Sequence, residues 1–199
     1  DEVLQLAQQE RLQTIPLVQL YLAAFCMITV PEDKKHFQNL KANLEQQEQH
    51  LHHDELRNLY LLAINYCIRK LNDGQDIFYA EVYDLYKKSL EHEVLFHNEK
   101  LTPFTYKNIV SAGLRLKEFE WTEQFIYNYR DNLDHQYRES FFTFNLAKVY
   151  FEQKNYQQVV ELLHETHLSD FLTSLGAKVL LLKAFYELNE HMLLESLTV

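Results

Sequence analysis

A pattern of apolar residues recurs in the second half of the chain at intervals of 35 to 37 residues. The stretch 146–163 serves as a template, 109–126 matches it 37 residues earlier, and a third copy starts 35 residues later at Leu181. The aligned positions carry residues of similar kind: Ile109, Leu146 and Leu181; Leu114, Phe151 and Tyr186; Lys117, Lys154 and Asn189; Phe119, Tyr156 and His191. A unit of this length cannot bury its apolar face alone, so the repeat restricts the chain to folds in which copies of one small unit stack.

Each repeat unit is expected to be a pair of helices. Apolar residues follow helical spacing almost throughout the chain, and only 3 glycines and 3 prolines interrupt it. Thr102 and Pro103 have the pattern of a helix start, and no segment alternates as a strand would. The sequence therefore predicts an all-α fold of antiparallel helical hairpins in a single domain over residues 1–199. Divergent hairpins are expected over 1–100 and repeats over 103–139, 140–173 and 174–199, the last of them incomplete.

The residues of 140–173 resemble those of a known family. Leu146, Ala147 and Tyr150 stand in the first helix, where the tetratricopeptide repeat has its leucine, small residue and tyrosine. Tyr156, Val159 and Leu163 stand in the second helix, at its aromatic, small and large apolar positions. The chain thus resembles the tetratricopeptide-repeat (TPR) family, whose unit is about 34 residues, best over residues 103–197. The resemblance implies an α-solenoid with a right-handed superhelical twist.

The sequence departs from the family pattern at several packing positions. Val159 and Thr122 replace the usual alanine, and Gly113 replaces the tyrosine. Small residues at these positions let the two helices of a hairpin approach, so the departures bear on how closely each hairpin packs.

The resemblance also implies a binding surface, because solenoids of this family bind peptides or helices on the concave side formed by the first helix of each pair. The residues expected on that side are Phe104, Lys107, Asn108, Phe141, Phe144, Asn145, Lys148, Phe151, Lys183 and Tyr186. Asn108 and Asn145 fall where some family members hold a terminal carboxylate, but aromatic or apolar residues replace the accompanying basic ones. An aromatic groove is therefore expected, with Phe151 facing it and Tyr150 facing the core. The alternative is that these aromatic residues pack against further helices.

Charge and cysteine content limit the classes of partner and compartment. The formal net charge of −10 opposes nucleic-acid binding, which needs a surplus of lysine and arginine. The longest apolar stretch, 17–30, is too short to span a bilayer, so no membrane partner is expected. Cys26 and Cys67 lie in apolar helical patterns without a CxxC pair, which favours free thiols and a cytoplasmic location.

No residue cluster has the spacing of a catalytic or metal site. His50, His52, His53 and Asp54 lie in a polar stretch typical of a solvated helix face, and the spacing of His92 and His97 does not fit a zinc motif. We therefore expect no cofactor and a non-enzymatic scaffold that binds a protein or peptide. The alternatives are a helical enzyme or regulator with a polar His/Glu pocket and a helical-repeat RNA binder. Self-association through a solenoid end is also expected, because apolar residues gather at the C-terminus: Leu193, Leu194, Leu197 and Val199.

Overall fold

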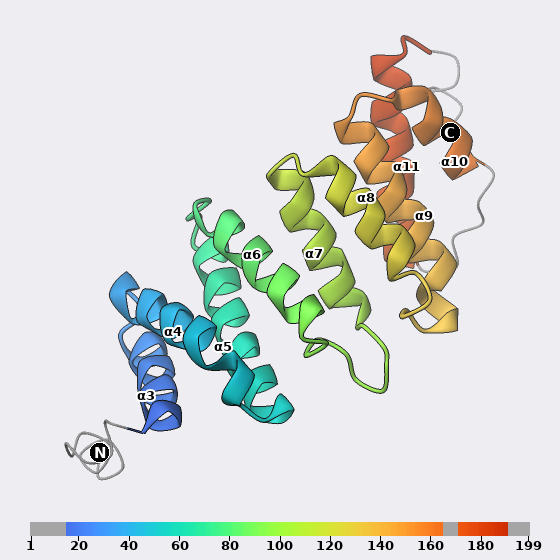
Figure 1. The fold of residues 1–199 in the computed structure, drawn as a ribbon. Coiled ribbons are helices and arrows are strands. Elements are labelled where there is room, and N and C mark those ends of the chain that lie inside the picture. Colours follow the sequence, from blue (N-terminus) through green and yellow to red (C-terminus); the bar gives the residue numbers. More distant parts are fainter. Residues whose placement is uncertain (1–14, 165–170, 191–199) are drawn as a thin grey trace. The chain divides into compact units, whose positions relative to one another are not determined.

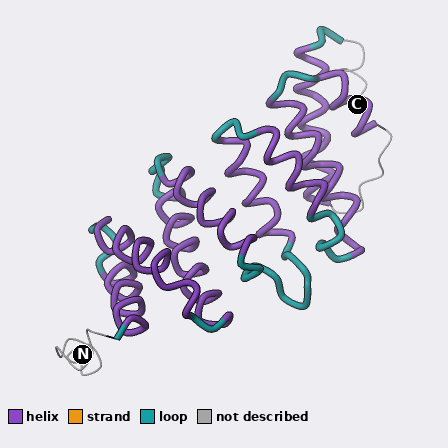
Figure 2. The backbone as a smooth tube through the Cα atoms, viewed as in Figure 1, coloured by secondary structure: helices purple, strands orange, loops and turns teal. Residues whose placement is uncertain are grey.

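The computed structural model describes residues 15–164 and 171–190, and these residues contain helices and no β-strand (Figures 1 and 2). The helices are α3 (Pro16–Thr29), α4 (Lys34–Gln47), the short 3-10 helix η1 (Glu48–His50), α5 (His53–Asn72), α6 (Phe78–Glu91), α7 (Pro103–Arg115), α8 (Phe119–Asn128), α9 (His135–Glu152), α10 (Tyr156–His164) and α11 (Phe171–Glu187). The predicted all-α class is confirmed. Within the described ranges, every helix is too short or too polar to cross a membrane. The C-terminal residues 191–199, on which the predicted self-association rests, lie outside the described residues.

The chain divides into two compact units, Asp1–Leu95 and Phe96–Val199. In the first unit α3 packs on α4 and α5 packs on α6, and α5 also contacts both helices of the preceding pair. In the second unit α9 contacts α7 and α8, and α11 contacts α9 and α10. The division lies close to the predicted boundary between divergent hairpins and repeats. Assignment of both units to a single domain stays a prediction, as does their arrangement as a solenoid.

Three buried aromatic rings, one from each of three helices, pack together in the first unit. Phe37 of α4 stacks on Tyr66 of α5 with ring centroids 5.1 Å apart, and Phe78 of α6 meets both rings edge-on at 5.8 and 5.7 Å. Beside them the buried Lys70 places its ammonium 3.1 Å from the carboxylate of Glu32 and over the ring of Tyr66. The unit is therefore held by aromatic packing between pairs, with the buried charge neutralised at its edge.

Helices α7, α9 and α11 of the second unit end in the same way. Lys117, Lys154 and Asn189 occupy the aligned position, and all three have left-handed backbone, with φ of 62°, 63° and 58°. The next residue in each case donates its N–H to a carbonyl five residues back, as Glu118 does to Gly113 at 2.9 Å. These hydrogen bonds close the helix end in a Schellman motif, usually formed with glycine. The same closure ends α5 at Gly74 and α6 at Glu93, so it is common to helix ends in both units, and the 35-to-37-residue repeat stays a prediction.

Two departures from the family pattern compensate for each other in the α7–α8 hairpin. A Cβ on Gly113 would lie 2.1 Å from the hydroxyl oxygen of Thr122, so the glycine makes room for the larger threonine. Thr122 is fully buried, and its hydroxyl donates to the carbonyl of Glu118 at 2.6 Å. The hairpin therefore packs closely even though its small residue, Gly113, lies on α7, whereas the family pattern has the small residue on the second helix, at the position of Thr122.

Candidate functional site

A pocket of about 320 Å³ opens in the second unit where residues of α7, α9 and α11 meet. Its lining residues are Pro103, Phe104 and Lys107 from α7, Tyr137, Phe141, Phe144 and Asn145 from α9, and Thr173 from α11. Half of the ten residues predicted to face a groove are among them: Phe104, Lys107, Phe141, Phe144 and Asn145. We call this feature the aromatic pocket. It brings together side chains that are far apart in the sequence, such as Phe104 and Asn145, which are separated by 41 positions.

Helical spacing places the four α9 residues on one side of that helix. Tyr137, Phe141 and Phe144 follow one another at intervals of four and three residues, which form a continuous stripe on a helix. The rings of Tyr137 and Phe141 meet edge-on with centroids 6.0 Å apart. Phe104 lies at the rim with 80% of its side chain exposed. A large exposed aromatic ring beside a hollow is the usual form of a contact residue at a protein interface.

Asn145 is the buried polar group of the aromatic pocket. It is only 1% exposed, and its amide nitrogen donates to the carbonyl oxygen of Phe141 at 2.8 Å. Its amide oxygen Oδ1 is buried without a hydrogen-bond partner. Leaving a buried acceptor unpaired costs about 1–3 kcal/mol, so this atom favours any ligand that brings a donor to it.

Two lysines lie together beside the aromatic wall. Lys107 lines the pocket, and the Nζ of Lys148 lies 5.9 Å from the centroid of the Phe144 ring. Burial first, and then the positive charge of Lys107, lower the pKa of Lys148 to about 8, while Glu152 acts in the opposite direction. Neither lysine forms an ion pair with another described residue. This side of the pocket therefore carries positive charge that an anion would neutralise.

Gly176 of α11 positions the ring of Phe144. A Cβ at Gly176 would lie 2.7 Å from the Cζ atom of Phe144, so the ring rests directly against the glycine backbone. The sequence analysis did not identify Gly176, Tyr137 or Thr173 as part of the site. A lone glycine inside a helix of good helix formers is a signal of close packing, and it is the one local clue to this contact.

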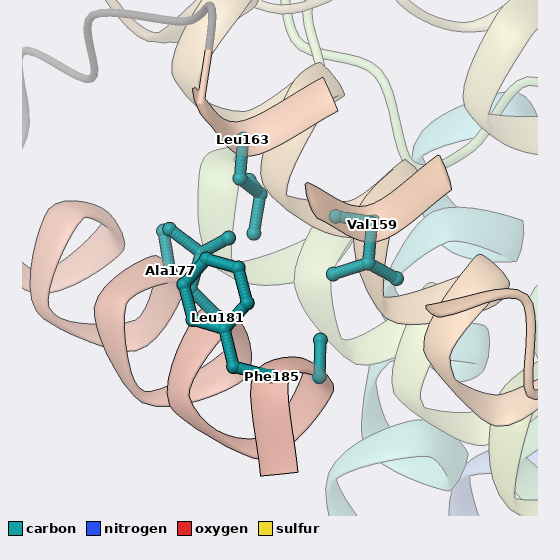
Figure 3. Close-up of a cluster of buried hydrophobic side chains, with 7 residues drawn as sticks. Val159, Leu163, Ala177, Leu181 and Phe185 are labelled. Carbon is teal, nitrogen blue, oxygen red and sulfur yellow. The ribbon is translucent and has the colours of Figure 1, made fainter. Parts of the chain in front are cut away.

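Phe151 is not among the residues that line the aromatic pocket, and its place in a groove stays a prediction. Its ring meets Tyr156 edge-on at 5.3 Å. Both rings pack against a buried cluster between α9, α10 and α11, whose own side chains are drawn in Figure 3. Tyr150 and the pocket residue Phe144 pack against the same cluster. The cluster consists of Ala147, Val159, Leu163, Ala177, Leu181, Ala184 and Phe185.

The remaining predicted groove residues do not line the pocket. Asn108 and Lys183 are exposed, and Tyr186 is 67% exposed on α11. Lys148 borders the pocket through Phe144 without lining it. Binding by these residues stays a prediction from the family resemblance.

In the first unit, Glu48 links two polar side chains, one from α5 and one from the residue that follows α6. Glu48 of η1 accepts a hydrogen bond from the hydroxyl of Tyr60 at 3.0 Å and lies 3.1 Å from the Nε2 of His92. Burial and the neighbouring Glu48 raise the pKa of Tyr60, which keeps the hydroxyl protonated as a donor.

His52 is the N-cap residue of α5, and its backbone N–H donates to the carboxylate of Glu55 at 3.4 Å. Across residues 15–164 and 171–190, no group of three His, Cys, Asp or Glu side chains is arranged to hold a metal ion.

No protein-family model, curated protein or solved structure matches this chain. The likeness to the tetratricopeptide repeat therefore stays an inference from the repeated residues. A proposal for the function rests on the aromatic pocket, its buried Asn145 and its two lysines.

Proposed function

We propose that this chain is a non-enzymatic interaction module that binds a segment of a partner protein, with the aromatic pocket receiving a large apolar side chain of that segment. The observation that carries the proposal is the convergence of three phenylalanines on a hollow whose buried Asn145 has an amide oxygen without a hydrogen-bond partner. A pocket of about 320 Å³ lies at the lower end of the range for small-ligand sites. That size suits one side chain of a bound segment, with the rest of the segment on the surrounding surface.

The helical arrangement of the second unit is compatible with this role. Contacts of α9 with α7 and of α11 with α9 place the first helices of successive pairs next to one another, as in a solenoid of stacked hairpins. We propose that the hairpins form such a TPR-like solenoid and that its first helices supply the binding surface. Cytoplasmic location and the lack of a cofactor or nucleic-acid partner belong to the same proposal.

Two phenylalanines with similar exposure provide a matched test of the site. Phe104 is 80% exposed at the pocket rim, and Phe171 is 77% exposed at the start of α11, outside the pocket lining. Peptides selected from a random display library with the native protein are titrated against Phe104→Ala and Phe171→Ala. We expect Phe104→Ala to weaken binding about tenfold or more and Phe171→Ala to leave it within twofold.

Circular dichroism of both variants checks that neither exposed substitution changes the fold. Equal binding by the native protein and Phe104→Ala would show that the selected peptides do not use the pocket, and the proposed function would be wrong. Failure of the native protein to select any peptide would count against it in the same way.

A further inference from the structure

The aromatic pocket lacks two things that a partner would have to supply. One is a hydrogen-bond donor for the Oδ1 atom of Asn145, and the other is negative charge for Lys107 and Lys148. The whole chain carries a net charge of −10, so two lysines that form no ion pair with a described residue stand out from the overall composition, although Glu152 lies near enough to act on Lys148. Asn145 and Lys148 lie close together on α9, because Lys148 follows Asn145 by three residues.

The orientation of Asn145 restricts the form of the partner. The carbonyl of Phe141 accepts from the amide nitrogen, which leaves the buried amide oxygen as the one polar side-chain atom of Asn145 without a hydrogen-bond partner. A carboxylate offers only acceptors and is repelled by that oxygen, so the carboxyl terminus of a peptide does not fit there. A backbone N–H does fit, and an extended segment has such groups free along its length. In a helix the N–H groups beyond the first turn are already bonded within the helix.

The lysines restrict the charge of the partner. Lys148 is largely desolvated beside the Phe144 ring and is repelled by Lys107. A carboxylate placed between them would offset both effects, and a bond between ionised groups is stronger than one between neutral groups. A basic or neutral segment would leave the repulsion unrelieved.

We propose that the partner is an internal, extended, acidic segment: its apolar side chain fills the aromatic pocket, a backbone N–H donates to Asn145 Oδ1, and an Asp or Glu near that side chain pairs with Lys107 and Lys148. This inference rests on the proposed function and adds to it the chemistry and conformation of the bound segment. It excludes an amphipathic helix and a terminal carboxylate as the occupant of the pocket.

The test uses three pools of short fluorescein-labelled peptides with amidated C-termini, measured by fluorescence anisotropy against the whole chain. Each pool has a central Phe or Leu, and the flanking residues are drawn from Asp and Gly, from Ser and Gly, or from Lys and Gly. We expect the aspartate pool to bind about tenfold more tightly than the serine pool and the lysine pool to bind most weakly. The double variant Lys107→Met with Lys148→Met should remove the difference between the aspartate and serine pools, whereas the exposed Lys178→Met should preserve it.

Asn145 is tested with the same probes. Methylation of the backbone nitrogen of the central residue removes its N–H, and we expect this to weaken binding to the native protein about tenfold. Asn145→Leu should make methylated and unmethylated peptides bind equally, because the acceptor is gone. Thermal melts of Asn145→Leu and of the double lysine variant confirm that they are folded.

The outcomes separate the two proposals. Equal binding of the aspartate and serine pools, with binding still dependent on Phe104, would overturn the acidic segment and leave the proposed function standing. Tighter binding of peptides with a free C-terminal carboxylate than of their amidated forms would overturn the internal segment. If none of the pools binds, both proposals are wrong.

Discussion

The ring of Phe144 in α9 packs against the backbone of Gly176 in α11, so closely that a Cβ on Gly176 would lie only 2.7 Å from the Cζ atom of Phe144. The contact holds the position of Phe144, which lines the aromatic pocket, although Gly176 itself is not among the lining residues. Phe144 can avoid an added methyl group only by turning away from α11. The size of the pocket therefore depends on a residue that a ligand would not touch.

Gly176→Ala is accordingly expected to reduce peptide binding with little loss of stability. Alanine favours the helix by about 1 kcal/mol over glycine, which offsets part of the cost of moving the Phe144 ring. We expect affinity for the aspartate-flanked peptides to fall several-fold while the urea midpoint changes little. Phe144→Leu in the Gly176→Ala background removes the clash and should restore part of the affinity. Full affinity in Gly176→Ala alone would contradict a binding role for this wall.

Gly113 and Thr122 offer a second test of close packing, this time in the α7–α8 hairpin. Because a Cβ on Gly113 would lie 2.1 Å from the Thr122 hydroxyl oxygen and 3.3 Å from its Cβ, Gly113→Ala should destabilise the chain by about 2 kcal/mol. The further change Thr122→Ala removes the hydroxyl and should recover more than half of that loss. Urea unfolding of the two single variants and the double variant measures the coupling. Additive effects would show that the two residues do not limit each other.

Periodicity predicted the helices and much of the pocket, but it did not predict which helix each residue meets. Aligning the repeats was sufficient to group Phe104 with Phe141 and Asn145, because equivalent positions on adjacent first helices lie side by side. Phe144 and Phe151 share a helix face and both pack against the cluster between α9, α10 and α11, but they lie about 10 Å apart along the axis and only Phe144 lines the pocket. The contact of Phe144 with Gly176 depends on how closely α11 packs on α9, and the local sequence of α9 does not predict that distance.

Phe151→Ala tests the predicted groove position of this residue directly. The sequence alone predicted that this variant would keep its stability and lose partner binding. In the structure Phe151 packs against Tyr156 and the buried cluster between α9, α10 and α11, so we expect Phe151→Ala to lose about 2–3 kcal/mol of unfolding free energy. Peptide binding at the aromatic pocket should stay within twofold under conditions where the variant is folded. Native stability in Phe151→Ala would instead restore the groove assignment.

Self-association of the chain can be tested on the part of α11 that the structure describes. Leu175, Val179 and Tyr186 are exposed on this helix, and the first two lie one turn apart on the same face. If association uses this face, Val179→Lys should lower the apparent mass measured by analytical ultracentrifugation. The exposed Ile77 of the first unit provides the control, and Ile77→Lys should leave the mass unchanged. A native protein that is monomeric at every concentration would show that the prediction is wrong.

Lys148→Met is expected to stabilise the chain in a pH-dependent way. The folded-state pKa of about 8 lies below the ordinary value of 10.5, so the protonated form of Lys148 is less favourable in the folded chain than in the unfolded one. The cost is fully present below pH 8. It declines as pH rises toward 10.5, because the folded chain releases this proton before the unfolded chain does.

Methionine keeps the apolar stem without the charge, so the variant should gain about 1–2 kcal/mol at pH 7 and lose that advantage by about pH 10. Urea unfolding of both proteins across this pH range measures the difference, and the shifts of the tyrosines cancel because both proteins share them. Lys178→Met, which removes an exposed lysine on α11, should change stability by less than about 0.5 kcal/mol at every pH. An advantage of Lys148→Met that did not vary with pH would mean that the charge of Lys148 is not its source.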